Sequence, residues 1–272
     1  MPDRKSPRRT PAATFAARRR RLLLAIGGIT LTGAVAPHLL AGPGEHEPKL
    51  AVPHDLHGRQ ELAAHQERTP HHGRPHPADQ PMYYIDDTDK AIALTIDDGP
   101  DPVYTPQVLQ VLQQYHVTAT FSMIGLHVAA YPRMAREVVT AGHRIANHTW
   151  THSDLAGMPA PGVHRELART SRAIHAATGV HPALFRAPYG AWSDAVFRQC
   201  TQMRMAPLDW SVDPRDWARP GVRSIVRTIM RETQPGSIIL EHDGGGNRSE
   251  TVRALRIVLP RLLSEGYHFE TP

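Results

Sequence analysis

The sequence predicts an α/β fold in which parallel strands, covered by helices, curl into a barrel that need not be complete. Three observations lead to this prediction. From Met82 onward, short apolar stretches typical of strands alternate with longer stretches of helical periodicity, as in βαβ units. The chain of 272 residues is long enough for one such barrel. Polar residues also recur at the same end of successive predicted strands, where parallel barrels carry their sites.

The first 41 residues predict export or membrane anchoring. Residues 1–21 contain eight Lys and Arg against one acid, and the apolar stretch Leu22–Ala36 follows. A basic segment followed by a short apolar stretch and small residues is typical of an export signal, and Arg19–Leu23 loosely fits the twin-arginine type. An uncleaved anchor is the alternative, because the apolar stretch can be extended to Ala41. We favour export, so the protein is expected to be secreted or tethered outside the cytoplasm.

The net charge of +5 does not indicate a nucleic-acid partner. Removing residues 1–21 takes away eight of the 31 basic residues and one of the 26 acidic residues, which leaves 23 and 25. The basic excess therefore belongs to the N-terminus and not to a binding face. The single cysteine, Cys200, excludes an internal disulfide and a cysteine-based zinc site. Nothing in the sequence reports the oligomeric state, and we expect a monomer.

Residues 42–81 are rich in Pro, His and charged residues and show little apolar periodicity, which predicts a flexible linker. The seven histidines of this segment allow a second interpretation, a metal-scavenging tract. Their spacing fixes no coordination geometry, so the solvated linker is favoured. The folded domain is then expected over residues 82–272.

Strands and helices are expected to alternate through that domain. The predicted strands are Ala91–Asp97, Ala119–Gly125, His143–His148, Ala183–Arg186, Arg204–Asp209, Ser237–His242 and Tyr267–Thr271. The predicted helices are Thr105–Tyr115, Ala129–Ala141, Val163–Thr178, Ser193–Thr201, Val222–Glu232 and Glu250–Glu265.

The first predicted strand ends in two adjacent acids, Asp97 and Asp98, followed by a Gly-Pro turn. Successive side chains on a strand point to opposite sides, so one carboxylate can hold a cation while the other faces a substrate. An ordinary strand end is the alternative, because Asp and Gly-Pro are common turn residues.

A second motif, His148–His152, begins at the end of the third predicted strand. Its first and last residues share a face if the segment makes a helical turn, and they can then bind one metal ion. With Asp98 they would form a zinc-type ligand set that leaves a position open for water or substrate. A hydrogen-bonded loop is the alternative, and the acidic strand end favours the metal.

Three further motifs follow later strands. Arg186 can orient a carboxylate by a bidentate contact, and the turn after it can direct backbone N–H groups at an oxyanion. In Asp213–Trp217, one acid can pair with Arg186, and Trp217 can form the wall of a sugar site. In Leu240–His242, the histidine can donate a proton near neutral pH. The alternatives are a surface Arg at a turn, a solvated loop with a packed Trp, and a buried structural His.

In this order the motifs resemble those of the polysaccharide deacetylases, the NodB-homology or carbohydrate esterase 4 family. The resemblance extends from about Ala91 to the C-terminus. It implies a distorted (β/α)7-type parallel barrel, related to the TIM barrel, and a metal-dependent N- or O-deacetylase. Two positions depart from the family pattern: Ile96 stands where an aromatic residue is frequent, and Glu241 where an apolar residue is common. The glutamate suggests a polar contact on the outer face of its strand.

The resemblance implies acid–base roles for four residues. Asp97 would be the catalytic base, and His242 would be the acid that protonates the leaving group. Arg186 would orient Asp97. Asp216, in preference to Asp213, would hold Arg186.

It also implies the residues that bind metal and substrate. The ligands of a divalent cation, Zn²⁺ or alternatively Co²⁺, would be Asp98, His148 and His152. Tyr189 would offer its backbone N–H to the oxyanion, and Leu240 would line the acetyl pocket. Trp217 would contact the sugar.

An extracytoplasmic enzyme of this family would act on polymers outside the membrane. N-acetylglucosamine in chitin oligomers or peptidoglycan is the expected substrate, and O-deacetylation of acetylxylan is the alternative. Hydrolysis of another C–N bond is a further possibility. A non-catalytic carbohydrate-binding protein on the same fold would be expected to lack at least one of Asp97, His148, His152 and His242, and the chain has all four.

Overall fold

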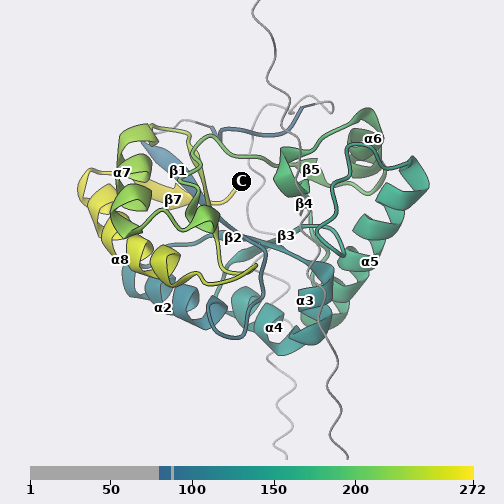
Figure 1. Ribbon diagram of the computed structural model, residues 1–272, viewed down its shortest axis with the longest axis horizontal. Helices are drawn as coiled ribbons and strands as arrows, with labels where there is room; N and C mark the ends of the chain where they lie inside the picture. The colour runs from purple at the N-terminus through teal and green to yellow at the C-terminus, as the bar shows by residue number, and fades with distance from the viewer. Residues whose placement is uncertain (1–79, 87–88) are drawn as a thin grey trace, which may run out of the picture. The chain divides into compact units, whose positions relative to one another are not determined.

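A computed structural model describes residues 80–86 and 89–272 of the chain (Figure 1). The predicted export segment, and the predicted linker up to residue 79, lie outside the described residues. Among the described residues, no helix has both the length and the apolar character that crossing a membrane requires.

The strands of the described region form one parallel sheet at the centre of the domain (Figure 1). They are β1 (Ala91–Asp97), β2 (Thr120–Met123), β3 (Arg144–Asn147), β4 (Leu184–Phe185), β5 (Ala206–Pro207), β6 (Ile238–His242) and β7 (His268–Glu270). The sheet runs β5-β4-β3-β2-β1-β6, and β7 also pairs with β1. All residues of β1 are buried, as expected for a strand that pairs on both edges and is covered on both faces.

The two ends of this sheet are connected by a short segment before β1. Met82 bridges to Leu208, just after β5, and Tyr84 bridges to Ser237, just before β6. The sheet therefore curls into a barrel that is bridged at one seam and not closed by a full strand ladder. The predicted fold class, a distorted parallel barrel, is confirmed.

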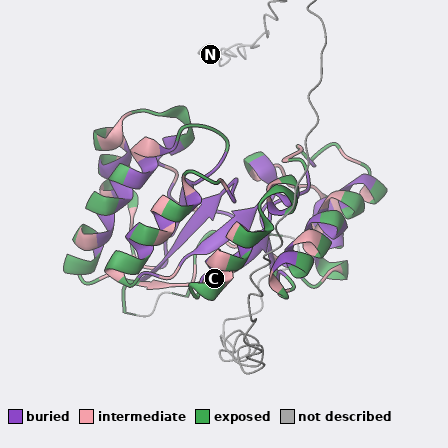
Figure 2. Ribbon diagram, turned by 90° about the horizontal axis from the view of Figure 1, so that it is seen from below, coloured by how far each residue is buried: buried purple, intermediate pink, exposed green. Residues whose placement is uncertain are grey.

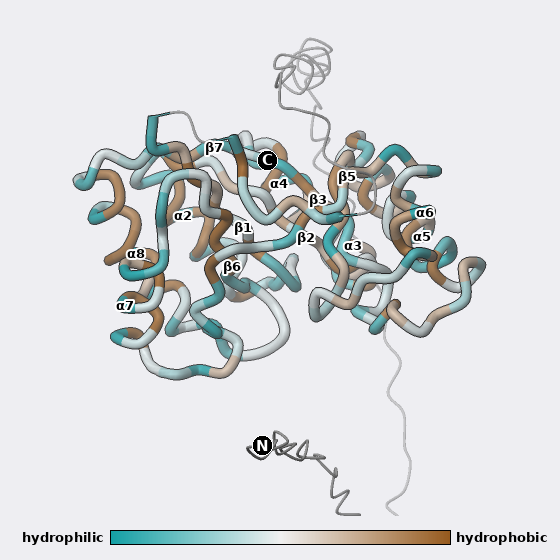
Figure 3. Tube along the Cα trace, turned by 90° about the horizontal axis from the view of Figure 1, so that it is seen from above, coloured by the Kyte–Doolittle hydropathy of each residue, from teal (hydrophilic) through white to brown (hydrophobic). Residues whose placement is uncertain are grey.

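The helices cover the outside of the sheet, with buried residues facing inward and exposed residues facing outward (Figure 2). They are α2 (Thr105–Tyr115), α3 (Gly125–Ala130), α4 (Pro132–Thr140), α5 (Ala160–Thr178), α6 (Asp194–Gln202), α7 (Val222–Glu232) and α8 (Ser249–Ser264), with short 3₁₀ turns η1 (Pro188–Gly190) and η2 (Asp216–Ala218). Figure 3 shows hydrophobic positions along α2, α5, α6 and α8. The largest core cluster joins β1 and β2 to α2, α7 and α8, and a second joins β4 to α5 and α6.

One predicted helix is wrong. The stretch Ala129–Ala141 is divided between α3 and α4, and the division falls at Pro132, which has no backbone N–H to donate and occupies the first turn of α4. The strand before it is also shorter than predicted, because α3 begins at Gly125, two residues after β2 ends. This early start places the first turn of α3 beside the loop that follows β3.

Candidate active site and metal centre

The predicted site residues converge at the carboxyl ends of the strands. Asp97 ends β1 and His242 ends β6, and the strand register pairs the two residues directly. A cavity of about 380 Å³ opens there, lined by Asp97, Asp98, His148, His152, Ala187, Tyr189, Trp210, Asp213, Trp217, Leu240 and His242. All the predicted site residues except Arg186 and Asp216 line this cavity, and those two are buried.

Asp98, His148 and His152 form the one cluster in the described part of the chain whose side chains could together hold a metal ion. Oδ1 of Asp98 lies 3.2 Å from Nε2 of His152 and 3.5 Å from Nε2 of His148. This oxygen is buried and has no hydrogen-bond partner, which is costly for a carboxylate unless a cation approaches it. Two imidazoles and a carboxylate are typical zinc ligands, so the donor set fits a divalent cation.

The second nitrogen of each histidine has its own contact. Nδ1 of His148 lies 2.8 Å from the carbonyl oxygen of Arg186 and therefore donates its proton there. Nδ1 of His152 lies 3.0 Å from the hydroxyl of Tyr189. Such contacts fix the ring orientation of metal-binding histidines. In both cases Nε2 is the atom that faces Asp98.

Two members of this cluster have the protonation that suits a cation. Burial alone raises the pKa of Asp98, but the nearby imidazole of His148 outweighs it and holds that pKa below its usual range. Burial and the charge of His148 lower the pKa of His152. At neutral pH Asp98 is therefore a carboxylate and His152 a neutral imidazole, the forms that bind metal. Burial lowers the pKa of His148, but the charges of Asp97 and Asp98 raise it above its usual value, so a cation would have to displace a proton from that ring.

The backbone at the metal motifs is strained. Asp98, Thr149 and His152 have φ angles of 75°, 66° and 58°, a region that costs non-glycine residues about 1–3 kcal/mol each. A Cβ on Gly244 would lie 2.1 Å from the carbonyl oxygen of Asp98, so the loop after β6 can pass the metal motif this closely only with glycine. Strain concentrated here indicates that neighbouring elements hold the ligands in place.

Asp97 is held by Arg186, but through one nitrogen and not through the bidentate contact expected from the sequence. Nη1 of Arg186 donates to Oδ1 of Asp97 and to Oγ1 of Thr95, each at 2.8 Å, and Nη2 donates to the carbonyl oxygen of Asp209 at 2.7 Å. The arginine is fully buried. The other oxygen of Asp97, Oδ2, lies 3.7 Å from Nε2 of His148 and lines the cavity.

Asp216 does not hold Arg186, so that part of the prediction is wrong. Its Oδ1 lies 2.6 Å from Nδ1 of His242, and its Oδ2 accepts hydrogen bonds from the backbone N–H of His242 at 3.0 Å and the hydroxyl of Thr251 at 2.6 Å. The reason is topological: η2, which carries Asp216, packs against β6, whereas Arg186 reaches the Asp209 carbonyl instead. Asp216 thus orients the proposed acid and not the proposed base.

This contact determines the charge of His242. Burial by itself lowers the pKa of His242, but the hydrogen bond and the charge of Asp216 raise it to about 9. His242 is therefore protonated at neutral pH, with Nδ1–H directed at Asp216 and the rest of the ring in the cavity. A protonated imidazole beside the cavity is suited to donate a proton.

Glu241 is fully buried beside Asp216. Burial raises its pKa well above the usual value, and the charge of Asp216 adds to this effect. Burial thus favours the neutral form of the Glu241 carboxyl group. Among the described residues, neither carboxyl oxygen of Glu241 has a hydrogen-bond partner, so the polar contact expected on the outer face of β6 is wrong.

The predicted substrate residues occupy the cavity and its rim. Tyr189 is 70 % exposed and Trp217 is 46 % exposed, and both line the cavity, so their rings are accessible to a ligand there. Leu240 is buried at the cavity wall. Tyr189 has a φ of 63°, so its peptide is part of another strained turn at this site.

Several contributing residues were missed by the sequence analysis. Trp210 lines the cavity, Asp209 holds Arg186 through its carbonyl, and Glu166 on α5 holds the loop between the two histidines. The position of Glu166 in its helix could have revealed it. Val163, three residues before it, and Thr170, four residues after it, are buried, so an apolar side chain is expected at this position. A backbone carbonyl leaves no such trace in the sequence.

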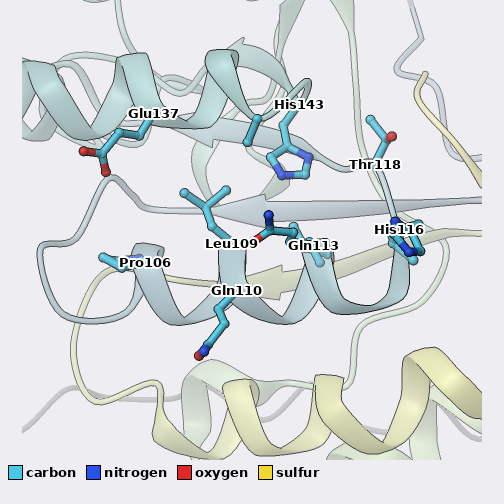
Figure 4. Close-up of a pocket in the computed structure, with 11 residues that line it drawn as sticks. Pro106, Leu109, Gln110, Gln113, His116, Thr118, Glu137 and His143 are labelled. Carbon is cyan, nitrogen blue, oxygen red and sulfur yellow. The ribbon is translucent and has the colours of Figure 1, made fainter.

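A second cavity, of about 510 Å³, lies between α2 and α4 and is lined by residues including Gln113, His116, Glu137 and His143 (Figure 4). Burial lowers the pKa of His143 to about 4, and its Nδ1 accepts a hydrogen bond from the backbone N–H of Ala119. His143 is therefore a neutral structural residue. Size alone does not identify the site, because the metal-ligating cluster belongs to the smaller cavity.

Known proteins similar to the chain point in the same direction. The profile of the polysaccharide deacetylase family matches residues 85–208. A chitooligosaccharide deacetylase of Bradyrhizobium sp. (strain ANU 289) is 44 % identical over 190 residues, which is 65 % of this chain and 87 % of that protein. A peptidoglycan-N-acetylglucosamine deacetylase of Bacillus cereus is 42 % identical over 189 residues, 69 % of this chain and 88 % of that protein.

Solved structures agree on the fold. The Bc1960 peptidoglycan N-acetylglucosamine deacetylase superposes with a TM-score of 0.68 at 30 % identity, covering 70 % of this chain and 89 % of that one. BA3943 of Bacillus anthracis, a CE4 family pseudoenzyme, superposes with a TM-score of 0.67 at 30 % identity, covering 71 % of this chain and 67 % of that one. Together with the curated relatives, these matches show that the chain belongs to the polysaccharide deacetylase family, the NodB-homology or carbohydrate esterase 4 enzymes.

Proposed function

We propose that the protein is a metal-dependent hydrolase that removes acetyl groups from N-acetylglucosamine residues of an extracytoplasmic polysaccharide, either chitin oligomers or peptidoglycan. One observation carries the proposal. The unsatisfied cluster of Asp98, His148 and His152 lies in the same cavity as a carboxylate held by Arg186 and a protonated histidine. One protein with a similar fold is a pseudoenzyme, so the fold alone does not indicate activity. The presence of this residue set is the stronger support for an active enzyme.

A divalent cation would be held by the imidazoles of His148 and His152 and the Asp98 carboxylate. Zn²⁺ suits this donor set best, and Co²⁺ is the alternative. When bound, such an ion polarises an acyl carbonyl and lowers the pKa of a water molecule. The chain supplies the remaining chemistry.

Asp97 acts as the base. Arg186 donates a hydrogen bond to Oδ1 of Asp97, and Oδ2 lies on the side of His148. Oδ2 is the atom that takes the proton of the attacking water. The same ion pair fixes the direction of the carboxylate. The backbone N–H of Tyr189 stabilises the negative oxygen that develops on the substrate.

His242 acts as the acid. Its proton passes to the nitrogen of the departing amine, which is a poor leaving group unless it is protonated. Asp216 keeps the imidazolium formed and oriented before the reaction. An acetyl ester needs this proton less, because its alcohol leaves more easily, so the strongly supported acid favours an N-acetyl substrate.

The names of the relatives support the substrate class, since chitooligosaccharide and peptidoglycan deacetylases both act on N-acetylglucosamine polymers. The N-terminal basic and apolar segments support a location outside the cytoplasm. An acetylxylan O-deacetylase is the second candidate, because the Xyl-CE4 domain of a multidomain xylanase is also similar, with a TM-score of 0.63 at 34 % identity.

The test measures acetate release from chitooligosaccharides, peptidoglycan fragments and acetylxylan, each with and without a chelator. We expect release from the first two substrates, abolished by the chelator and restored by Zn²⁺. Glycan binding without acetate release from any substrate would refute the proposal and support a binding protein. Faster release from acetylxylan would favour the second candidate.

A further inference from the structure

The turn between the two ligand histidines is held by one carboxylate outside the cavity, Glu166 on α5. Its Oε2 accepts hydrogen bonds from the backbone N–H of Trp150 at 2.9 Å, the backbone N–H of Thr151 at 3.0 Å and the hydroxyl of Thr151 at 3.1 Å. Hydrogen bonds to an ionised acceptor are stronger than neutral ones. A single side chain thus fixes two consecutive peptide groups of the metal motif.

The carbonyls of the same turn are held by α3. The N–H groups of Gly125 and Leu126 donate to the carbonyl oxygens of Thr149 and Trp150, at 2.9 and 3.1 Å. A Cβ on Gly125 would lie 2.4 Å from the Trp150 ring, so glycine allows this approach. The turn is therefore clamped through its N–H groups by α5 and through its carbonyls by α3.

The two histidines depend on this clamp to different degrees. His148 directly follows β3, and its Nδ1 is bound to the Arg186 carbonyl, so the strand places it. His152 lies beyond the turn, its φ is positive, and its ring contacts the exposed Tyr189. Its distance from Asp98 is therefore set mainly by the conformation of the turn.

We infer that Glu166 is a positioning residue of the metal centre, whose hydrogen bonds hold the turn that brings His152 to Asp98 and His148 and so raise the affinity for a divalent cation. The inference rests on the proposed metal-dependent function and adds a residue to it. Glu166 does not line the cavity, so its effect is on the cation and not on the substrate.

The test measures the Zn²⁺ affinity of the full chain by competition with a chromophoric chelator, below the unfolding temperature of each metal-free variant. Glu166→Ala should weaken Zn²⁺ binding by about 10- to 100-fold, as for other partners of ligand residues. Glu166→Gln keeps an acceptor without the charge and should lose less. Saturating Zn²⁺ should restore most of the acetate release of both variants, which a general packing defect would not allow.

The matched control is Glu137→Ala, which removes an exposed carboxylate paired with Arg133 on α4 and should leave the Zn²⁺ affinity unchanged. In a His152→Ala background, Glu166→Ala should cause little further loss, because it acts through that ligand. Unchanged affinity in Glu166→Ala, or a loss that adds fully to that of His152→Ala, would overturn the inference. A wild-type chain that binds no Zn²⁺ would instead refute the proposed function. If Glu166→Ala does not fold, Glu166→Gln decides.

Discussion

The acid–base half and the metal half of the site are built in opposite ways. In the first, Asp97 is bound to Arg186, and His242 is bound to Asp216. In the second, Asp98 faces two histidines, and one of its oxygens has no hydrogen-bond partner. The proposed acid–base half therefore has its hydrogen-bond partners within the folded chain, whereas the proposed metal half leaves a buried oxygen free for a cation.

The two halves also differ in their backbone. Asp97 and His242 are paired residues at the ends of neighbouring strands, and regular strand geometry places them. Asp98 and His152 both have positive φ angles, and His152 lies in a loop held by other elements. Regular secondary structure thus positions the proposed proton-transfer groups, while strained turns position the proposed metal ligands.

Breaking the metal half should have the largest effect. Asp98→Ala removes the carboxylate ligand, so Zn²⁺ binding should be lost and acetate release should fall by about three orders of magnitude or more, because the cation contributes several kcal/mol to the reaction. Metal content and acetate release from chitooligosaccharides measure this, with thermal unfolding as the control for folding. Unreduced turnover would show that the cation is bound elsewhere or not needed.

Breaking the acid–base half should leave the metal half intact. Asp97→Asn removes the base but keeps the size of the side chain, so kcat/KM should fall by about 10²- to 10⁴-fold. The Zn²⁺ affinity should stay close to that of the wild type. A fully active Asp97→Asn enzyme would end the assignment of Asp97 as the base.

A smaller and pH-dependent effect is expected at Asp216. His242 must be protonated to act, so activity is lost as the pH rises through its pKa, about 9 with Asp216 in place. Asp216→Asn removes the charge that raises this pKa, so the falling limb of the pH profile should move to lower pH. At pH 8 the loss should be on the order of tenfold, and little should change below pH 6. If the falling limb of the pH profile stays at the same pH in Asp216→Asn, Asp216 does not set the pKa of the catalytic acid.

The smallest effect is expected at the rim. Trp217 is 46 % exposed and offers a face on which a sugar can stack. Trp217→Ala should raise KM by up to about tenfold, the value of one aromatic contact, with kcat nearly unchanged. A loss confined to kcat would show that Trp217 contributes to the chemical step and not to substrate binding alone.

The strand ends were predictable from the sequence because they follow simple rules. The bounds of β1, α2 and α7 agree with the prediction, since each is a long apolar or amphipathic stretch with clear ends. Alternating strands and helices require the carboxyl ends of parallel strands to meet. That rule alone brought Asp98, His148 and His242 to one cavity.

Side-chain partnerships could not be predicted in this way. The sequence offered Asp213 or Asp216 as a partner of Arg186, but a choice between acids in one loop depends on how that loop packs against β6. The division between α3 and α4 was signalled by Pro132 and was overlooked. Glu166 lies 15 or 16 residues from its partners, so the signal it left is its place on the apolar face of a helix and not a short motif.

The most direct test of the central claim is a metal titration of chelator-treated protein, with acetate release from chitooligosaccharides as the readout. The account predicts no release without metal and full release at one equivalent of Zn²⁺ per chain, with Asp98→Ala showing no recovery at any Zn²⁺ concentration used. Full activity in protein shown to contain no bound metal would contradict it.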